Sequence, residues 1–194
     1  MTAKRLQRDD RRRQLLTTAL AVVRAEGVDA LTLARVAEEA GVSKPIAYEH
    51  FGTRAGLLIA LFKDYDDRTT EAVARALAAG PKRFEDTADI LAAAYIDCCL
   101  QMGPELSAVF DALSASAETE EFRRAWRAML VETFERAFTP FIAFPREAGP
   151  AALTGLLGAA EAMAEAAAAG RIARDAAVSA LAQVMTGSLA AWRR

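Results

Sequence analysis

Apolar residues recur along this chain with the three- or four-residue spacing of helices that bury one face, and no stretch alternates as a strand would. Glycine and proline interrupt the pattern at points where helices end. The helices that the pattern predicts span about residues 9–25, 32–40, 43–50, 54–79, 82–102, 105–117, 119–138, 151–169 and 174–192. Residues 1–8 are expected to be disordered. The predicted fold class is all-α, with about nine helices and no sheet.

The region from Thr32 to Phe51 has the pattern of two short helices joined by a tight turn. Gly41 falls where the first helix must stop, because glycine takes the left-handed conformation without steric cost. Ser43 is a natural N-cap for the second helix, and Pro45 fits its first turn, where a missing N–H is not needed. Two short helices with such a turn are the architecture whose second helix enters the major groove of DNA. The sequence therefore predicts a helix-turn-helix.

This region, together with the residues on either side of it, resembles the TetR family of bacterial transcriptional repressors. The matching residues are Leu15-Leu16-Thr17-Thr18-Ala19-Leu20, Val22-Val23, Glu26-Gly27, Thr32, Val36-Ala37, Ala40-Gly41-Val42-Ser43, Tyr48, His50-Phe51, Thr53-Arg54 and Leu57-Leu58. The resemblance covers roughly residues 11–62. It implies a three-helix DNA-binding domain at residues 1–54 and a helical effector-binding and dimerisation domain at residues 55–194. It also implies a homodimer formed through the last two helices.

Two residues depart from the family pattern. Ile46 stands where threonine is common, and Ala47 where leucine or isoleucine is usual. The small Ala47 leaves space that a neighbour such as Val23 or Phe51 must fill. Ile46 is expected to face outward, within reach of a thymine methyl group. Neither departure threatens the fold, but both leave the operator sequence open.

Nine residues are expected to contact DNA. Those expected at phosphate or sugar are Thr32, Lys44, Tyr48, His50 and Arg54. Those expected to face the bases are Ser43, Pro45, Ile46 and Glu49. Thr32 offers a hydroxyl beside free N–H groups at a helix start, although it can also serve only as an N-cap. Glu49 is repelled by DNA unless it accepts a hydrogen bond from a cytosine amino group, and it can equally point to water.

Charge is divided unevenly along the chain, whose net charge is −2. Residues 1–54 hold 10 Lys/Arg and 7 Asp/Glu, and residues 55–194 hold 14 and 19. Six of the basic residues lie among the first 13: Lys4, Arg5, Arg8, Arg11, Arg12 and Arg13. A positive amino-terminal domain on an acidic body suits an approach to DNA phosphates. The alternative for the first 13 residues is a solvated tail.

An effector site is expected among the fourth to seventh helices of the body. The candidates are large, apolar or aromatic residues: Tyr95, Cys99, Met102, Phe110, Trp126 and Phe134. Such a set suits a hydrophobic or aromatic small molecule, although each residue can also be plain core. Cys98 and Cys99 are adjacent and not expected to bridge each other. A redox role for either cysteine stays open.

The last two helices are apolar around much of their circumference, which favours a partner surface. The residues expected at a homodimer interface are Leu153, Leu156, Leu157, Met163, Val178, Leu181, Met185 and Leu189. Pairing with a second copy would give an isologous four-helix interface. The alternative is that these helices only pack on the fifth to seventh helices of their own chain.

Other classes of protein are disfavoured by what the sequence lacks. There is no run of 18 uncharged apolar residues for a membrane span, and the amino terminus lacks the apolar core of a signal peptide, so a cytoplasmic protein is expected. A di-metal helical enzyme needs Glu-x-x-His pairs, but the only histidine is His50 and position 47 is alanine. No metal, cofactor or enzyme activity is therefore expected. Glu161 and Glu165 are interpreted as a solvated face. A protein-binding module with a vestigial helix-turn-helix remains the second alternative.

Overall fold

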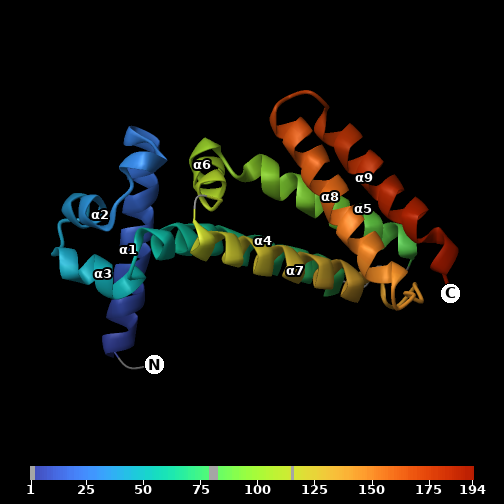
Figure 1. Ribbon diagram of the computed structural model, residues 1–194, viewed down its shortest axis with the longest axis horizontal. Coiled ribbons are helices and arrows are strands. Elements are labelled where there is room, and N and C mark those ends of the chain that lie inside the picture. Colours follow the sequence, from blue (N-terminus) through green and yellow to red (C-terminus); the bar gives the residue numbers. More distant parts are fainter. Residues whose placement is uncertain (1–2, 79–82, 115) are drawn as a thin grey trace. The chain divides into compact units, whose positions relative to one another are not determined.

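The structure is a computed structural model that describes residues 3–78, 83–114 and 116–194. This part of the chain consists mainly of nine α-helices and two 3₁₀ helices, η1 and η2 (Figure 1). The elements are α1 (Ala3–Glu26), η1 (Val28–Ala30), α2 (Leu33–Glu39), α3 (Lys44–Phe51), α4 (Arg54–Ala78), α5 (Phe84–Gln101), α6 (Pro104–Ala112), α7 (Ala117–Phe138), α8 (Ala148–Ala168), α9 (Arg174–Leu189) and η2 (Ala190–Trp192). The all-α fold class is confirmed. No helix in the described ranges is both long enough and apolar enough to cross a bilayer.

The chain packs as two compact units. Unit 1 combines the segment that ends at Asp66 with Met102–Arg123, and unit 2 combines Asp67–Gln101 with Arg124–Arg194. Helices α4 and α7 are each divided between the two units, α4 after Asp66 and α7 after Arg123. The domain boundary predicted between residues 54 and 55 divides DNA binding from effector binding and dimerisation. It does not describe packing units, and it stays a prediction.

Unit 1 has a core made from one apolar face of each of its first helices, as their residue spacing requires. Its buried side chains include Leu15, Leu16, Ala19, Val22, Val23, Leu33, Val36, Ala37, Ala47, Phe51, Leu57, Leu58 and Leu61. Helix α6 belongs to the same unit. The Phe110 ring lies 5.2 Å from that of Phe62, and Glu105 pairs with Arg24 of α1 at 2.6 Å. The packing unit that holds the helix-turn-helix therefore also includes α6.

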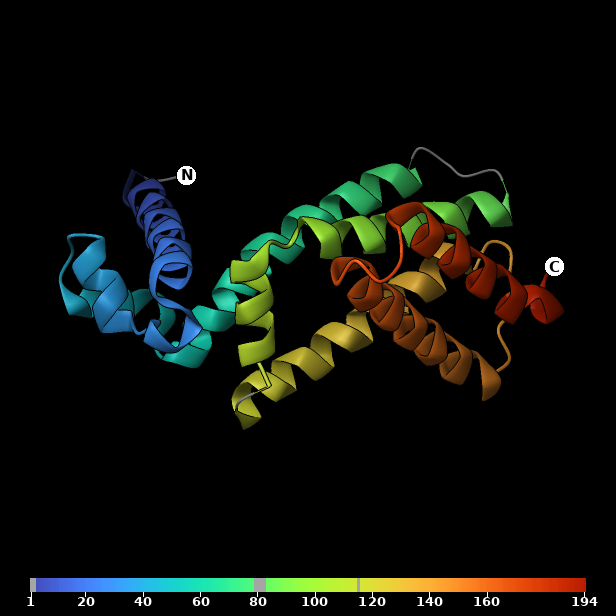
Figure 2. The same ribbon diagram turned by 90° about the horizontal axis from the view of Figure 1, so that it is seen from above.

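Unit 2 is built around α5, because both α8 and α9 pack against it. Figure 2 shows α9, in red, beside α5, in green. The buried cluster includes Phe84, Ala88, Leu91, Ile96, Phe134, Phe138, Ile142, Leu153, Leu156, Leu157, Leu181, Met185 and Leu189. The large apolar side chains of the two terminal helices thus fill the core of their own chain. This is the packing that the sequence left open as the alternative to a dimer interface.

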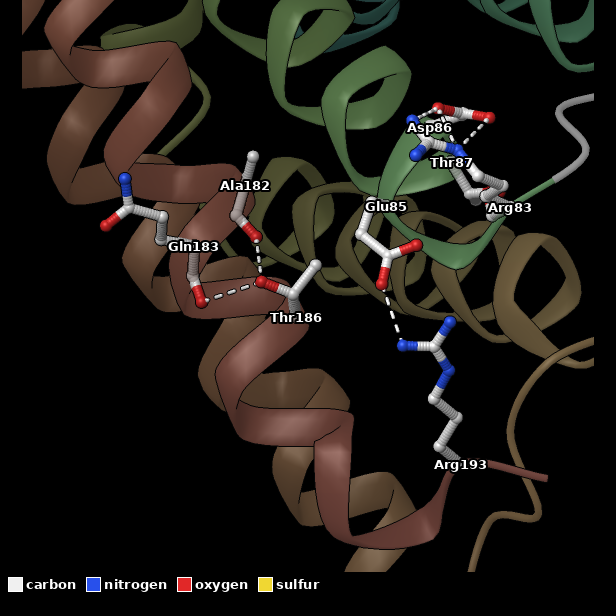
Figure 3. A network of polar contacts seen from close by, with 8 residues as sticks. All are labelled: Arg83, Glu85, Asp86, Thr87, Ala182, Gln183, Thr186 and Arg193. Atoms are coloured by element: carbon white, nitrogen blue, oxygen red, sulfur yellow. Dashed lines mark hydrogen bonds and ion pairs between the residues drawn. The ribbon is translucent and has the colours of Figure 1, made fainter.

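The last residues of the chain are fastened to unit 2. The backbone N–H of Ala143 donates to the carbonyl of Trp192 at 2.9 Å. Arg193 pairs with Glu85 in the first turn of α5 at 2.7 Å (Figure 3). The Arg193 guanidinium also lies 5.4 Å from the centroid of the Phe84 ring. These contacts hold the carboxyl end of the chain against the start of α5.

Helix α1 starts earlier than the sequence pattern predicted. It begins at Ala3, so the expectation of disorder is wrong for residues 3–8. This segment contains no glycine or proline, and lysine, arginine, leucine and glutamine are good helix formers. Asp9 and Asp10, near which the sequence pattern placed the start of the first helix, therefore lie inside α1.

The bounds of two later helices also differ from the prediction. Helix α6 ends at Ala112 rather than near residue 117, and the Ser114 hydroxyl beyond it donates to the carbonyl of Asp111 at 2.7 Å. Such local bonds compete with helix continuation. Helix α8 begins at Ala148, and Pro150 lies in its first turn, where no backbone donor is required. The predicted limits at 79 and 82 lie outside the described residues.

Candidate nucleic-acid interface

Helices α2 and α3 are joined by the turn that the sequence predicted. Gly41 has φ 65°, in the left-handed region that glycine adopts without strain. Thr32 caps α2, since its Oγ1 accepts a hydrogen bond from the backbone N–H of Arg35 at 3.1 Å. Ser43 occupies the N-cap position of α3 with an extended backbone, but its side chain makes no capping bond. Pro45 lies in the first turn of α3, as expected.

Helix α3 presents one apolar face to the core and one polar face outward. Ala47 and Phe51 are buried, one helical turn apart, so the small Ala47 is fully covered. The exposed residues are Lys44, Pro45, Tyr48 and Glu49, and the half-buried ones are Ile46 and His50. Tyr48 is 51% exposed, which is high for an aromatic side chain. A tyrosine so placed adds little to the core and is free to lie along a sugar–phosphate backbone.

Helix α1 fixes the positions of α2 and α3 through two polar side chains that the sequence reasoning missed. Arg12 Nη1 donates to the carbonyl of His50 at 3.2 Å, and its guanidinium lies 5.0 Å from the centroid of the Phe51 ring. Gln14 Nε2 donates to the carbonyl of Ala40 at 3.2 Å. The sequence held a partial signal, because Arg12 lies three residues before the buried Leu15 and so on the same face of the helix.

His50 lies half-buried at the carboxyl end of α3, close to several charges. Burial is the main cause that lowers the pKa of His50 below its usual 6.5, and the positive charge of Arg8 lowers it further. Arg12 and Arg11 act in the same direction, whereas Glu49 raises the pKa. The imidazole is therefore mainly neutral at neutral pH, in a locally positive environment.

Arg54 is partly occupied inside the protein. Its Nε donates to the carbonyl of Leu31 and its Nη2 to the carbonyl of Val28, both at 2.8 Å. These bonds tie the start of α4 to the segment before α2. The phosphate contact expected from the family resemblance stays a prediction, and the structure adds a role as a brace.

The candidate effector residues are divided between the two units. Met102 and Phe110 belong to unit 1, and Tyr95, Cys99, Trp126 and Phe134 belong to unit 2. Phe134 is buried in the core of unit 2, whereas the other five are half-buried. This set stays a prediction.

A polar group lies beside two of these candidates in unit 2. Glu161 is not merely solvated, because its two carboxylate oxygens lie 2.6 and 2.7 Å from Nη1 of Arg127. Burial and the nearby Cys99 and Glu161 raise the pKa of Tyr95. A hydrogen bond with Cys98, together with burial, raises the pKa of Cys99. A reactive thiol needs the opposite shift, so this environment disfavours a redox role for Cys99.

Most residues predicted at a dimer interface are buried within their own chain. Leu153, Leu156, Leu157, Leu181, Met185 and Leu189 are at most 1% exposed, and only Met163 and Val178 are half-buried. The outward positions of the same two helices carry small or polar residues instead: Thr154, Gly155, Gly158, Ala162, Ser179, Gln183 and Gly187. An interface through α8 and α9 stays a prediction, and the residues available for it are these outward ones together with Met163 and Val178.

Residues 15–61 match the family model described as bacterial regulatory proteins, tetR family. Over this stretch, which contains the helix-turn-helix, the chain matches the TetR family. Two curated relatives align with part of the chain. The first, over 73 residues at 40% identity, is the HTH-type transcriptional activator FasR of Mycolicibacterium smegmatis; the alignment covers 38% of this chain and 33% of FasR. The second, over 116 residues at 34% identity, is the HTH-type transcriptional regulator BetI of Rhizobium meliloti; it covers 59% of this chain and 56% of BetI.

The chain thus matches about a third of FasR and just over half of BetI along their lengths. A solved TetR-like transcriptional regulator from Rhodococcus sp. RHA1 has the same fold over nearly the whole chain. It covers 92% of this chain and 94% of its own at a TM-score of 0.64 and 23% identity. The names of both curated relatives describe transcriptional regulators.

Proposed function

We propose that the protein is a transcriptional regulator whose α3 enters the major groove of an operator. The observation that carries this proposal is the division of α3 into a buried face and an outward face. Ala47 and Phe51 anchor the helix in unit 1, while Lys44 and Tyr48 are exposed one turn apart. The names of FasR and BetI support a role in transcription regulation.

The residues divide by the part of DNA that each would contact. Lys44 and Tyr48 would contact phosphate and sugar, which set the position of a protein on the duplex without reading its sequence. Thr32, His50 and Arg54 would add phosphate contacts at the edges of the same surface. Ser43, Pro45, Ile46 and Glu49 would face the base edges, where sequence is read.

A homodimer would place two copies of α3 in successive major grooves, roughly 34–36 Å apart. The outward residues of α8 and α9 would form the contact between copies. Because Gly155, Gly158 and Gly187 among these residues have no side chain, the helix backbones of two copies can approach closely. A two-fold symmetric protein would then select an operator with two-fold symmetric half-sites.

A small hydrophobic or aromatic effector would control the affinity for DNA, and the protein would act as a repressor that the effector releases. An effector shifts the balance between two conformations only by its difference in affinity for them. The name of FasR, an activator, favours the opposite sign of control as a second candidate. A reporter gene behind the operator distinguishes the two, since loss of a repressor raises expression and loss of an activator lowers it.

DNA binding is tested by fluorescence anisotropy on a labelled duplex from the promoter beside the gene for this chain. Salt-sensitive binding is expected, with at least a tenfold loss for Lys44→Ala combined with Tyr48→Ala. Lys63→Ala is the matched control, because Lys63 is an exposed lysine of the same unit on α4. Binding that does not respond to salt, or that survives the double substitution, contradicts the proposal and favours a protein-binding module.

A further inference from the structure

The first turns of α1 place three arginines beside the end of α3. Arg8, Arg11 and Arg12 lie at the helical spacing that continues the face of the buried Leu15, so they point toward the helix-turn-helix rather than away from it. Arg12 contacts α3 directly, through the carbonyl of His50. Of the three, only Arg8 lies in the segment for which the sequence pattern predicted disorder, residues 1–8, and the structure places it within α1.

The three arginines are not equivalent. Arg12 is engaged with α3 and acts as a positioning residue, because its bond to His50 and its stacking on Phe51 fix α1 against the recognition helix. Arg8 is exposed, and Arg11 bonds only to the neutral side chain of Gln14. In the described part of the chain, neither Arg8 nor Arg11 forms an ion pair with a carboxylate.

The acidic residues of this segment lie elsewhere around the helix. Asp10 pairs with Arg13, and both are well exposed. Asp9 follows Arg8 by one position and therefore projects about 100° away from it around the helix. On the side of α3 the acidic group that acts on His50 is Glu49. Positive charge thus exceeds negative charge on the surface formed by α1 and the end of α3.

We propose that Arg8 and Arg11, together with His50, form a second phosphate-binding site that holds the DNA backbone outside the bases read by α3. This inference rests on the proposed function, and it adds two contacts from α1, those of Arg8 and Arg11, to the phosphate contact already proposed for His50. A phosphate placed here gains three nearby nitrogen donors and relieves the mutual repulsion of the guanidinium groups. Burial is the largest cause of the lowered pKa of His50, and the charges of Arg8, Arg12 and Arg11 each lower that pKa further, which places all three arginines within electrostatic reach of His50.

The site contacts phosphate only, so it has a distinct signature. The logarithm of the binding constant falls linearly with the logarithm of salt concentration, by about 0.9 for each phosphate contact. Arg8→Ala combined with Arg11→Ala should reduce that slope by about one unit per lost contact in each protomer, without changing which sequence is preferred. Affinity at low salt should fall by at least tenfold.

Arg13→Ala is the matched control, because Arg13 lies on the same helix but pairs with Asp10. It should leave both slope and affinity unchanged. Shortening the duplex at its ends should weaken wild-type binding and have little effect on the double variant. Circular dichroism spectra and thermal unfolding of each variant verify that α1 and the core are intact.

The outcomes separate this inference from the proposed function. If the wild-type protein binds DNA and depends on Lys44 and Tyr48, but the Arg8 and Arg11 double variant keeps the full salt slope, the second phosphate site is rejected and the regulator stands. The site is also rejected if Arg13→Ala lowers the slope as much. If the wild type shows no salt-sensitive binding at all, the proposed function itself fails.

Discussion

Arg54 shows how one residue can serve both the fold and DNA binding. Its guanidinium donates two hydrogen bonds to backbone carbonyls at 2.8 Å, one to Leu31 and one to Val28. Arg54→Lys keeps the positive charge but loses the planar fork that makes both bonds. We expect Arg54→Lys and Arg54→Ala to lower the free energy of unfolding by similar amounts, about 2 kcal/mol. Urea denaturation followed by circular dichroism measures this change.

The comparison with an exposed arginine makes the result specific. Arg13→Ala removes a surface ion pair with Asp10 and should cost no more than about 0.5 kcal/mol. If Arg54→Lys leaves the unfolding free energy at the wild-type value, the brace is unimportant and the phosphate contact is the main role of Arg54. The family pattern identified this position from sequence, but its bonds depend on how the chain returns to residues 28 and 31, which no local pattern encodes.

At the scale of single elements, α2 and α3 provide a matched pair of helix starts. Thr32 accepts a capping hydrogen bond from Arg35 at 3.1 Å, whereas Ser43 makes none with its side chain. We expect Thr32→Ala to lower the free energy of unfolding by about 1 kcal/mol and Ser43→Ala to have a clearly smaller effect. The same denaturation experiment compares the two variants. Equal losses would show that the Ser43 hydroxyl does cap α3 in solution.

Helices were predictable from the sequence where glycine stops them, and less so where polar side chains compete with the backbone. Gly41 has the positive φ that the turn requires, so α2 ends within a residue of its predicted limit. The early end of α6 depends on Ser114 and the early start of α1 on the lack of a breaker before Asp9. Both limits depend on local backbone preferences, which the spacing of apolar residues alone does not reveal.

At the scale of the whole molecule, the sequence correctly indicated the fold class but not the use of each apolar face. Leu156 and Leu181 were expected to meet a second copy, yet both are buried against their own chain. An apolar periodicity shows that a face is covered and does not say by what. The same limit applies to Phe134, which was expected at an effector site and is part of the core of unit 2. Composition cannot distinguish a lining residue from a filling one.

A homodimer through α8 and α9 can be tested without damaging this core. Substitutions of Leu156 or Leu181 would unfold unit 2 and say nothing about association. Gly158 is exposed on α8, and a Cβ atom there would have no neighbour within 4 Å in the described chain. Gly158→Leu should therefore be accommodated by the isolated chain and should raise its helix propensity by about 0.5–1 kcal/mol. In a close helix–helix contact between copies, however, the larger side chain has no room.

We accordingly expect Gly158→Leu to convert the dimer to a folded monomer, and to weaken operator binding because one copy contacts a single half-site. Size-exclusion chromatography with multi-angle light scattering measures the mass, and circular dichroism measures the helix content. Ala128→Leu is the control, since Ala128 is an exposed alanine on α7 of the same unit. A dimer that withstands Gly158→Leu would place the contact on another face of unit 2. A monomer produced equally by Ala128→Leu would instead locate the contact at α7.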